Sequence, residues 1–285
     1  MKKGMLKFVL AVLILLPVCA NAISWETFDG LPINSIGISG SNLVTSQGIY
    51  NLNTRTYSPI IFPEARLTST HGIDGTNIFG SYIDNFSNVT WHGFVFDGLN
   101  WVTFDKIDAE GTVICDMDGS NIIGYYVTSD IRHGFYYDST SWTIIDLPPL
   151  NNIGYNLMGI SGYNIVTTSG VYNLQTQIWT ELSFPNATST QICDIDGDII
   201  VGNYTDFSGY THGFLYNGGE WITLDYPGSL STTIGGIDGT TLVGTYYYYE
   251  SDQDYGYCGF VATIPEPISV LLFAGGALFV RRLSK

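Results

Sequence analysis

The residues best suited to bind a ligand are three aspartates at alternate positions, Asp194, Asp196 and Asp198, in the run Asp-Ile-Asp-Gly-Asp. Carboxylates spaced in this way match the start of a calcium loop, because their oxygens can meet one hard cation. The twelfth position of such a loop is Thr205 instead of a glutamate, and Asp-Gly is equally a hairpin turn. The pattern gives a weak calcium candidate beside an ordinary turn, and we expect no cofactor to be needed for folding.

Three of the four histidines occupy the same place in a repeated triplet, at His92-Gly93-Phe94, His133-Gly134-Phe135 and His212-Gly213-Phe214. Catalysis needs one asymmetric cluster, whereas repetition indicates that each histidine serves its own repeat as a hydrogen-bond donor at a strand start. The fourth histidine, His71, falls at an otherwise apolar position and is expected in the core. The sequence has no nucleophile elbow, P-loop, dinucleotide-binding glycine motif or zinc-ligand spacing. It therefore predicts no catalytic residue.

The triplets belong to a longer repeat that also contains a turn signal. A fourth triplet reads Cys258-Gly259-Phe260, and the turns are Asp74-Gly75, Asp118-Gly119, Asp196-Gly197 and Asp238-Gly239, with weaker copies at Ser39-Gly40 and Ser161-Gly162. Together they mark six units at intervals of roughly 35 to 45 residues, the range of blade and solenoid repeats.

Each unit is predicted to hold four short strands, which is the usual content of a propeller blade. In the fifth unit they are residues 192–195, 200–204, 213–216 and 221–225. The sixth unit ends at Thr263 without a fourth strand, while residues 25–32 match the fourth strand of the third unit. We expect an all-β fold: a six-bladed β-propeller over residues 23–263, closed by an N-terminal strand within residues 24–32.

The units resemble the HAF-type extracellular repeat of bacterial exported proteins. The resemblance rests on Asp-Gly, the Ile/Val-Gly-Tyr strand and His-Gly-Phe, and it runs through most of residues 36–263. It implies an extracellular repeat protein, and it implies no catalytic residue.

The N-terminus is predicted to be a signal peptide over residues 1–22. Lys2, Lys3 and Lys7 precede an apolar run, and Ala20 and Ala22 supply small residues at the cleavage positions. Cleavage after Ala22 would remove the export signal and leave Ile23 as the first residue of the mature protein.

The C-terminal segment, residues 264–285, resembles the PEP-CTERM sorting signal. The matching features are Pro265-Glu266-Pro267, an apolar run over residues 268–280 that we expect to form a short helix, and Arg281-Arg282. The 13-residue run is shorter than the roughly 20 residues that span a bilayer. The resemblance implies recognition by an exosortase-type enzyme, a transient stay in the inner membrane, and an exported protein of a Gram-negative bacterium associated with exopolysaccharide and biofilm matrix.

Three cysteines, Cys115, Cys193 and Cys258, would remain after signal removal. Cys115 and Cys193 hold equivalent places two units apart. Packed sheets lie about 10 Å apart, and a disulfide needs Cα atoms within roughly 7 Å. All three are therefore predicted to be free thiols.

The charge distribution limits the possible partners. The full chain has a net charge of −16, and residues 23–263 keep only four basic residues against 25 acids. Nucleic acid is excluded as a partner, because phosphate contacts need Lys and Arg.

Two functions remain open. The first is a non-enzymatic cell-surface or matrix protein whose propeller serves binding or structure, with aromatic side chains such as those of residues 246–249 available for sugar rings. The alternative is a secreted polysaccharide hydrolase or lyase with a site in the propeller channel. That site would need unrepeated acids to converge there, and the candidates are Glu181, Glu220 and Glu250.

Overall fold

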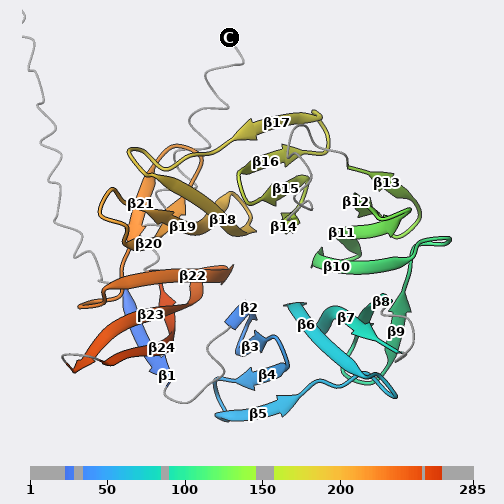
Figure 1. Cartoon of the computed structure of the whole chain (residues 1–285), viewed down its shortest axis with the longest axis horizontal. Helices are drawn as coiled ribbons and strands as arrows, with labels where there is room; N and C mark the ends of the chain where they lie inside the picture. Colours follow the sequence, from blue (N-terminus) through green and yellow to red (C-terminus); the bar gives the residue numbers. More distant parts are fainter. Residues whose placement is uncertain (1–22, 29–34, 85–89, 146–156, 252–253, 265–285) are drawn as a thin grey trace, which may run out of the picture.

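The computed structural model describes residues 23–28, 35–84, 90–145, 157–251 and 254–264, and it is all-β across these ranges. The predicted signal peptide and residues 265–285 of the predicted sorting signal, with Ala20, Ala22, Pro265, Glu266, Pro267, Arg281 and Arg282, lie outside them, whereas Ile264 is within the described part. Six four-stranded antiparallel sheets are arranged around a central axis as the blades of a propeller (Figure 1). The predicted fold is therefore confirmed.

Blades 1 to 3 each run from an innermost to an outermost strand in sequence order. Blade 1 consists of β2 (Ser35–Ser39), β3 (Asn42–Thr45), β4 (Gly48–Asn51) and β5 (Thr56–Pro59). Blade 2 consists of β6 (Leu67–Asp74), β7 (Asn77–Ile83), β8 (Trp91–Phe96) and β9 (Trp101–Phe104). Blade 3 consists of β10 (Gly111–Asp118), β11 (Asn121–Thr128), β12 (Ile131–Tyr137) and β13 (Trp142–Ile144).

Blades 4 and 5 repeat this order, and blade 6 borrows its last strand from the N-terminus. Blade 4 consists of β14 (Leu157–Ser161), β15 (Asn164–Thr167), β16 (Gly170–Asn173) and β17 (Ile178–Glu181). Blade 5 consists of β18 (Ser189–Asp196), β19 (Ile199–Thr205), β20 (Thr211–Tyr216) and β21 (Trp221–Leu224). Blade 6 consists of β22 (Ser231–Asp238), β23 (Thr241–Ser251), β24 (Asp254–Thr263) and β1 (Ser24–Phe28).

The closing strand β1 pairs antiparallel with β24, from Ser24 opposite Thr263 to Phe28 opposite Gly259. Trp25 fixes this position, since its ring lies 4.9 Å from that of Phe260 and 5.5 Å from that of Tyr226. The predicted closure by an N-terminal strand is therefore correct. It joins the two ends of the described chain into one sheet.

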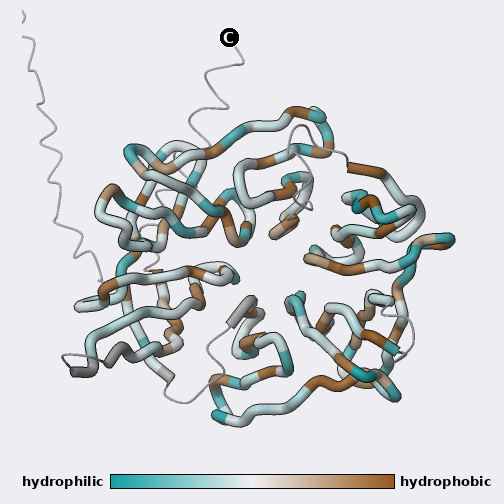
Figure 2. Tube along the Cα trace, in the orientation of Figure 1, coloured by the Kyte–Doolittle hydropathy of each residue, from teal (hydrophilic) through white to brown (hydrophobic). Residues whose placement is uncertain are grey.

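The hydrophobic core is divided into clusters between adjacent blades, and Figure 2 shows hydrophobic segments spread around the ring. Val201 and Leu215 of blade 5 pack with Ile234 and Leu242 of blade 6, and comparable clusters occupy the other five interfaces. The described chain contains no helix with the length and hydrophobicity to cross a membrane.

The glycine of the His-Gly-Phe triplet is required by this blade-to-blade packing. A Cβ atom at Gly213 would lie 2.7 Å from Leu224 O and 2.7 Å from Ile234 Cγ1 of the next blade. The following phenylalanine, Phe214, is fully buried. The triplet therefore encodes close contact between neighbouring sheets.

We expect Gly213→Ala to destabilise the propeller by about 1–3 kcal/mol, the usual cost of overpacking a core. Thermal unfolding followed by circular dichroism measures this as a lower Tm. The matched control is Gly219→Ala in an exposed turn, where the nearest atom to the added methyl group is 4.0 Å away. Equal melting temperatures for the two variants would contradict this role of the triplet glycine.

Candidate functional site

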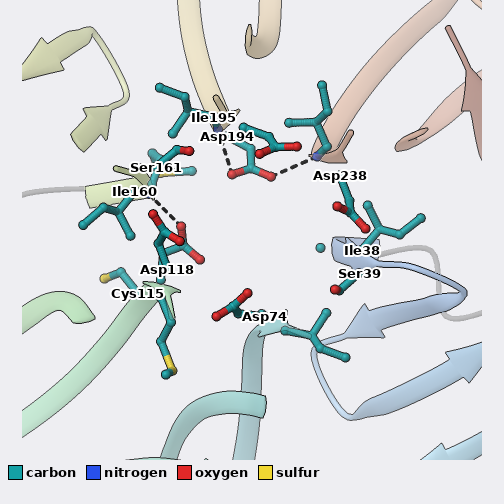
Figure 3. A pocket seen from close by; sticks show the side chains of 18 of the residues that line it. Ile38, Ser39, Asp74, Cys115, Asp118, Ile160, Ser161, Asp194, Ile195 and Asp238 are labelled. Carbon is teal, nitrogen blue, oxygen red and sulfur yellow. Dashed lines mark hydrogen bonds between the residues drawn. The ribbon is translucent and has the colours of Figure 1, made fainter. Parts of the chain in front are cut away.

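The innermost strands of the six blades surround a central channel that contains a cavity of about 130 Å³. Its walls carry the carboxylates of Asp74, Asp116, Asp118, Asp194, Asp196 and Asp238 (Figure 3). No Lys or Arg is among the residues that line it. The cavity is thus acidic, and it is smaller than the roughly 300–1,000 Å³ of typical ligand pockets.

Every innermost strand has a β-bulge at the same place, one residue before the channel-facing segment. The irregularity lies between Ser35 and Gly37, Thr70 and Gly72, Ile114 and Asp116, Leu157 and Gly159, Ile192 and Asp194, and Ile234 and Gly236. A bulge re-aims a side chain and is frequent beside functional sites. Here it brings four bulge residues to the cavity wall: His71, Cys115, Met158 and Cys193.

His71 was expected in the core and lies at the cavity wall, where it is largely buried. Its Nδ1 is 2.6 Å from Ile114 O and therefore donates, while Nε2 accepts from Ser81 Oγ at 3.3 Å. Burial lowers the pKa of His71, so the ring is neutral at physiological pH. Because both nitrogens of the neutral ring already form hydrogen bonds, the side chain stabilises the cavity wall, and neither nitrogen is left to accept a proton from a ligand.

The Asp-Gly and Ser-Gly turns form a closed ring of hydrogen bonds between blades. In each turn the Asp or Ser side chain accepts a backbone N–H from the turn glycine of the next blade. The pairs are Ser39 with Gly75 (3.1 Å), Asp74 with Gly119 (2.7 Å), Asp118 with Gly162 (2.6 Å), Ser161 with Gly197 (2.9 Å), Asp196 with Gly239 (2.6 Å) and Asp238 with Gly40 (2.6 Å).

The glycines of this ring all have φ between 55° and 60°, the left-handed region that a glycine adopts without strain. The repeated motif therefore has two roles, since it turns the hairpin and links its blade to the next. The interpretation as a hairpin turn alone was incomplete.

Asp116 and Asp194 stand two residues before the turn aspartate of their innermost strands. They break the repeat, because the other four blades have glycine at this position. Asp116 Oδ2 accepts from Ile160 N at 2.7 Å, and Asp194 accepts from Ile237 N at 2.9 Å and Ile195 N at 2.8 Å. Each carboxylate thus ties its strand to the backbone of the following blade, and Asp194 also accepts from the next residue of its own strand.

Burial is the main cause that raises the pKa of both aspartates. It raises the pKa of Asp194 to about 7, although the two backbone donors act in the opposite direction. It raises the pKa of Asp116 well above the usual range, and the negative charge of Asp194 adds to this effect. Burial likewise raises the pKa of the Cys115 and Cys193 thiols to about 12, so both are protonated. Cys115, Cys193 and Cys258, the cysteines within the described ranges, form no disulfide with one another.

The calcium candidate is not assembled as a site. Asp194 and Asp196 face the channel and hold backbone donors of blade 6, whereas Asp198 is exposed and does not line the cavity. Among the described residues, no group of three His, Cys, Asp or Glu side chains has the geometry to hold a metal ion.

Two of the three unrepeated acids considered for a catalytic channel, Glu181 and Glu220, do not line it. Glu181 ends the outermost strand β17, and Glu220 precedes the outermost strand β21. Glu250 lies in β23, and its side chain is outside the described part of the chain. Glu181 and Glu220 therefore do not converge in the channel, as the alternative of a catalytic channel would require.

The repeated histidines serve their own blades, as expected. His92 stacks on Tyr82 (5.1 Å) and its Nδ1 lies 2.7 Å from Asp105. His212 repeats this in blade 5, stacking on Tyr204 at 4.9 Å and lying 2.9 Å from Asp225. Each imidazole thus links the third strand of its blade to the end of the fourth.

Comparisons with known proteins identify no family. No family model and no curated protein matches the sequence. Among solved structures, the β-propeller domain of the trilobed protease from Pyrococcus furiosus has a TM-score of 0.42 and 15% identity, covering 63% of this chain and 61% of that one. The match thus spans less than two thirds of that chain.

Two further structures give similar values. The acylaminoacyl peptidase of Pyrococcus horikoshii has a TM-score of 0.41 and 12% identity, covering 81% of this chain and 42% of that one. The Aleuria aurantia lectin in complex with alpha-methyl-L-fucoside has a TM-score of 0.40 and 13% identity, covering 71% and 77%.

Proposed function

We propose that this protein is exported to the cell surface or extracellular matrix of a Gram-negative bacterium, where its propeller serves binding or structure without catalysis. In this proposal the signal peptide is removed after Ala22, and an exosortase-type enzyme reads Pro265-Glu266-Pro267 while residues 268–280 hold the chain transiently in the inner membrane. Exopolysaccharide is the proposed partner.

The observation that supports this proposal is the completeness of the ring between the two predicted signals. β1 begins at Ser24, two residues after the expected cleavage site, and Ser24 pairs directly with Thr263. Ile264 is buried, and its N–H donates to Thr240 O at 2.8 Å. The described strands of all six blades thus lie between Ser24 and Thr263, and the two segments proposed for export and sorting flank them.

A binding or structural role is further supported by the roles of the repeated residues. The turn aspartates bond the next blade, the triplet glycine permits close packing, and His92 and His212 brace their own sheets. The motifs that recur through the chain are thus used by the fold.

The alternative of a polysaccharide hydrolase or lyase has one supporting observation, the buried pair Asp116 and Asp194. A cavity of about 130 Å³ argues against a sugar substrate at that pair, since typical ligand pockets are larger. An activity screen on the host exopolysaccharide tests the alternative, and cleavage lost in Asp194→Asn would establish it.

The sorting proposal predicts that Glu266→Ala leaves the protein in the inner membrane with its tail intact. Glu266 is the charged residue between two prolines that keep the segment from continuing a helix. Fractionation and intact-mass measurement of the expressed full-length protein check this. The control is Glu220→Ala in the propeller, which should be processed as the wild type is. Equal processing of both variants would contradict recognition of the Pro-Glu-Pro segment.

A further inference from the structure

Blade 6 has a two-stranded extension that is not found in the described strands of the other blades. β23 and β24 contain 11 and 10 residues, and their pairing continues from Thr241 opposite Thr263 to Ser251 opposite Asp254. On one side β22 stops pairing at Tyr247, and on the other β1 stops at Gly259. The distal hairpin therefore extends past both neighbouring strands, at the lower left of Figure 1.

One face of this extension is aromatic. Side chains of a strand alternate between faces, so Tyr247 and Tyr249 share a face with Tyr257, which is directly opposite Tyr247. The rings of Tyr247 and Tyr257 are 3.6 Å apart between centroids. Tyr249 is 61% exposed and Tyr257 46% exposed. On the other face Tyr246 stacks on Tyr226 at 3.7 Å and anchors the hairpin to the propeller.

The half of the ring that carries this hairpin contains acids and no fixed cation. No Lys or Arg occurs between Arg132 and Arg281, whereas residues 157–263 contain eleven Asp and Glu. Two of these, Asp206 and Asp225, are partly exposed beside His212. Asp225 directly precedes Tyr226, the anchor of the hairpin, so carboxylates lie near its base.

The hairpin and the chain ends are at opposite ends of blade 6. Ser24 and Thr263 lie beside the turn of Asp238 and Gly239, because Thr241 pairs with Thr263. Ser251 and Asp254 are at the far end of the same two strands. A tether that leaves from residue 264 would therefore hold the turn end toward the membrane and the aromatic face away from it.

We propose that Tyr247, Tyr249 and Tyr257 form a platform for a cationic amino-sugar polymer, a chain of hexosamine units with free, protonated amines. This rests on the proposed function as an exported binding module. The apolar face of a sugar ring stacks on a tyrosine ring, which presents a large amphipathic surface. The protonated amines pair with the surrounding carboxylates, while polyanionic chains are repelled.

The experiment measures binding of the exported protein to glucosamine hexamers by isothermal titration calorimetry, at a mildly acidic pH that protonates the amines. Fully N-acetylated hexamers and polygalacturonate are the comparison ligands. We expect measurable binding to the glucosamine hexamer, weaker binding to the acetylated one and none to polygalacturonate. Tyr249→Ala and Tyr257→Ala should each weaken binding by roughly tenfold, equivalent to about 1.4 kcal/mol.

The matched control is Tyr163→Ala, because Tyr163 is 55% exposed in the β14–β15 turn of blade 4. It should bind as the wild type does, and all three variants should keep the wild-type Tm. Two results would overturn the platform and leave only general charge attraction. One is equal binding of the glucosamine hexamer by all variants. The other is equal binding of the hexamer and of polylysine, a cationic polymer without sugar rings, by the wild type. Sedimentation of the protein as a tyrosine-dependent dimer would instead assign the face to a second copy.

Failure of the wild type to bind the glucosamine hexamer overturns this ligand. It leaves the proposed function standing if Glu266→Ala still blocks processing, so the two failures are distinguishable.

Discussion

Deletion of residues 23–34 should make the propeller aggregate, with loss of the cooperative unfolding transition. The deletion removes β1 and thereby exposes the free edge of β24. It also uncovers Phe260 and Tyr226, which Trp25 now covers. An exposed strand edge with unpaired backbone groups is a template for association between chains. The deletion variant keeps the signal peptide, joined directly to residue 35. Static light scattering measures its aggregation, and circular dichroism follows its thermal unfolding.

A matched control for this deletion is Glu26→Ala. Glu26 lies in β1 but points to solvent, where it pairs with Arg55 at 3.2 Å in an exposed ion pair. Such pairs contribute little to stability, so this variant should remain soluble. A deletion variant that stays soluble and melts cooperatively would mean that the ring does not depend on β1.

Asp194→Asn should stabilise the propeller at neutral and alkaline pH. Burial raises the pKa of Asp194 to about 7 in the folded protein, whereas an unfolded aspartate has a pKa near 3.8. The folded state therefore binds a proton that the unfolded state has already released. The stability gained from this proton is fully present below about pH 4 and is lost as the pH rises to about 7. For a difference of roughly three pKa units the linkage amounts to at most about 4 kcal/mol.

The measurement is urea unfolding of wild type and variant between about pH 5 and pH 8. The advantage of Asp194→Asn should grow with pH and level off above the folded pKa. Ile237 N donates to Oδ2 and Ile195 N donates to Oδ1, so the asparagine oxygen replaces only one of the two acceptors. Loss of the other bond lowers the stability of the variant by an amount that does not change with pH. Asp198→Asn, an exposed neighbour, is the control and should follow the wild type. A constant difference between Asp194→Asn and wild type across this range would disprove the titration of Asp194.

The fold could be predicted because its signals are local and repeated. Asp-Gly or Ser-Gly turns recur in all six units, and a tryptophan stands near the start of the outer strand in units two to five. The strand missing from the sixth unit is supplied by residues 25–32, which match the fourth strand of the third unit. The strand bounds differ from the prediction by up to three residues in blade 5, where β18 begins at Ser189 rather than residue 192. Longer pairing with β19 extends that strand.

The channel could be predicted only in part, because its contacts join residues of different blades. The bond from Gly239 N to Asp196 connects positions 43 residues apart, and nothing near either residue in the sequence indicates it. One signal was present and overlooked: at the place two residues before each turn, Asp116 and Asp194 stand where other units have glycine. Glu181 and Glu220 were chosen as unrepeated acids, but Glu181 ends the outermost strand β17 and Glu220 directly precedes the outermost strand β21.

The most direct test of the account is the intact mass of the wild-type protein isolated from its final location outside the inner membrane. The account predicts a chain that begins at Ile23, because β1 starts one residue later and closes the ring. It also predicts that Arg281 and Arg282 are absent, because the tail is processed after Pro265-Glu266-Pro267 is read. A mature protein that retains Arg281 and Arg282 at that location would contradict sorting through the tail.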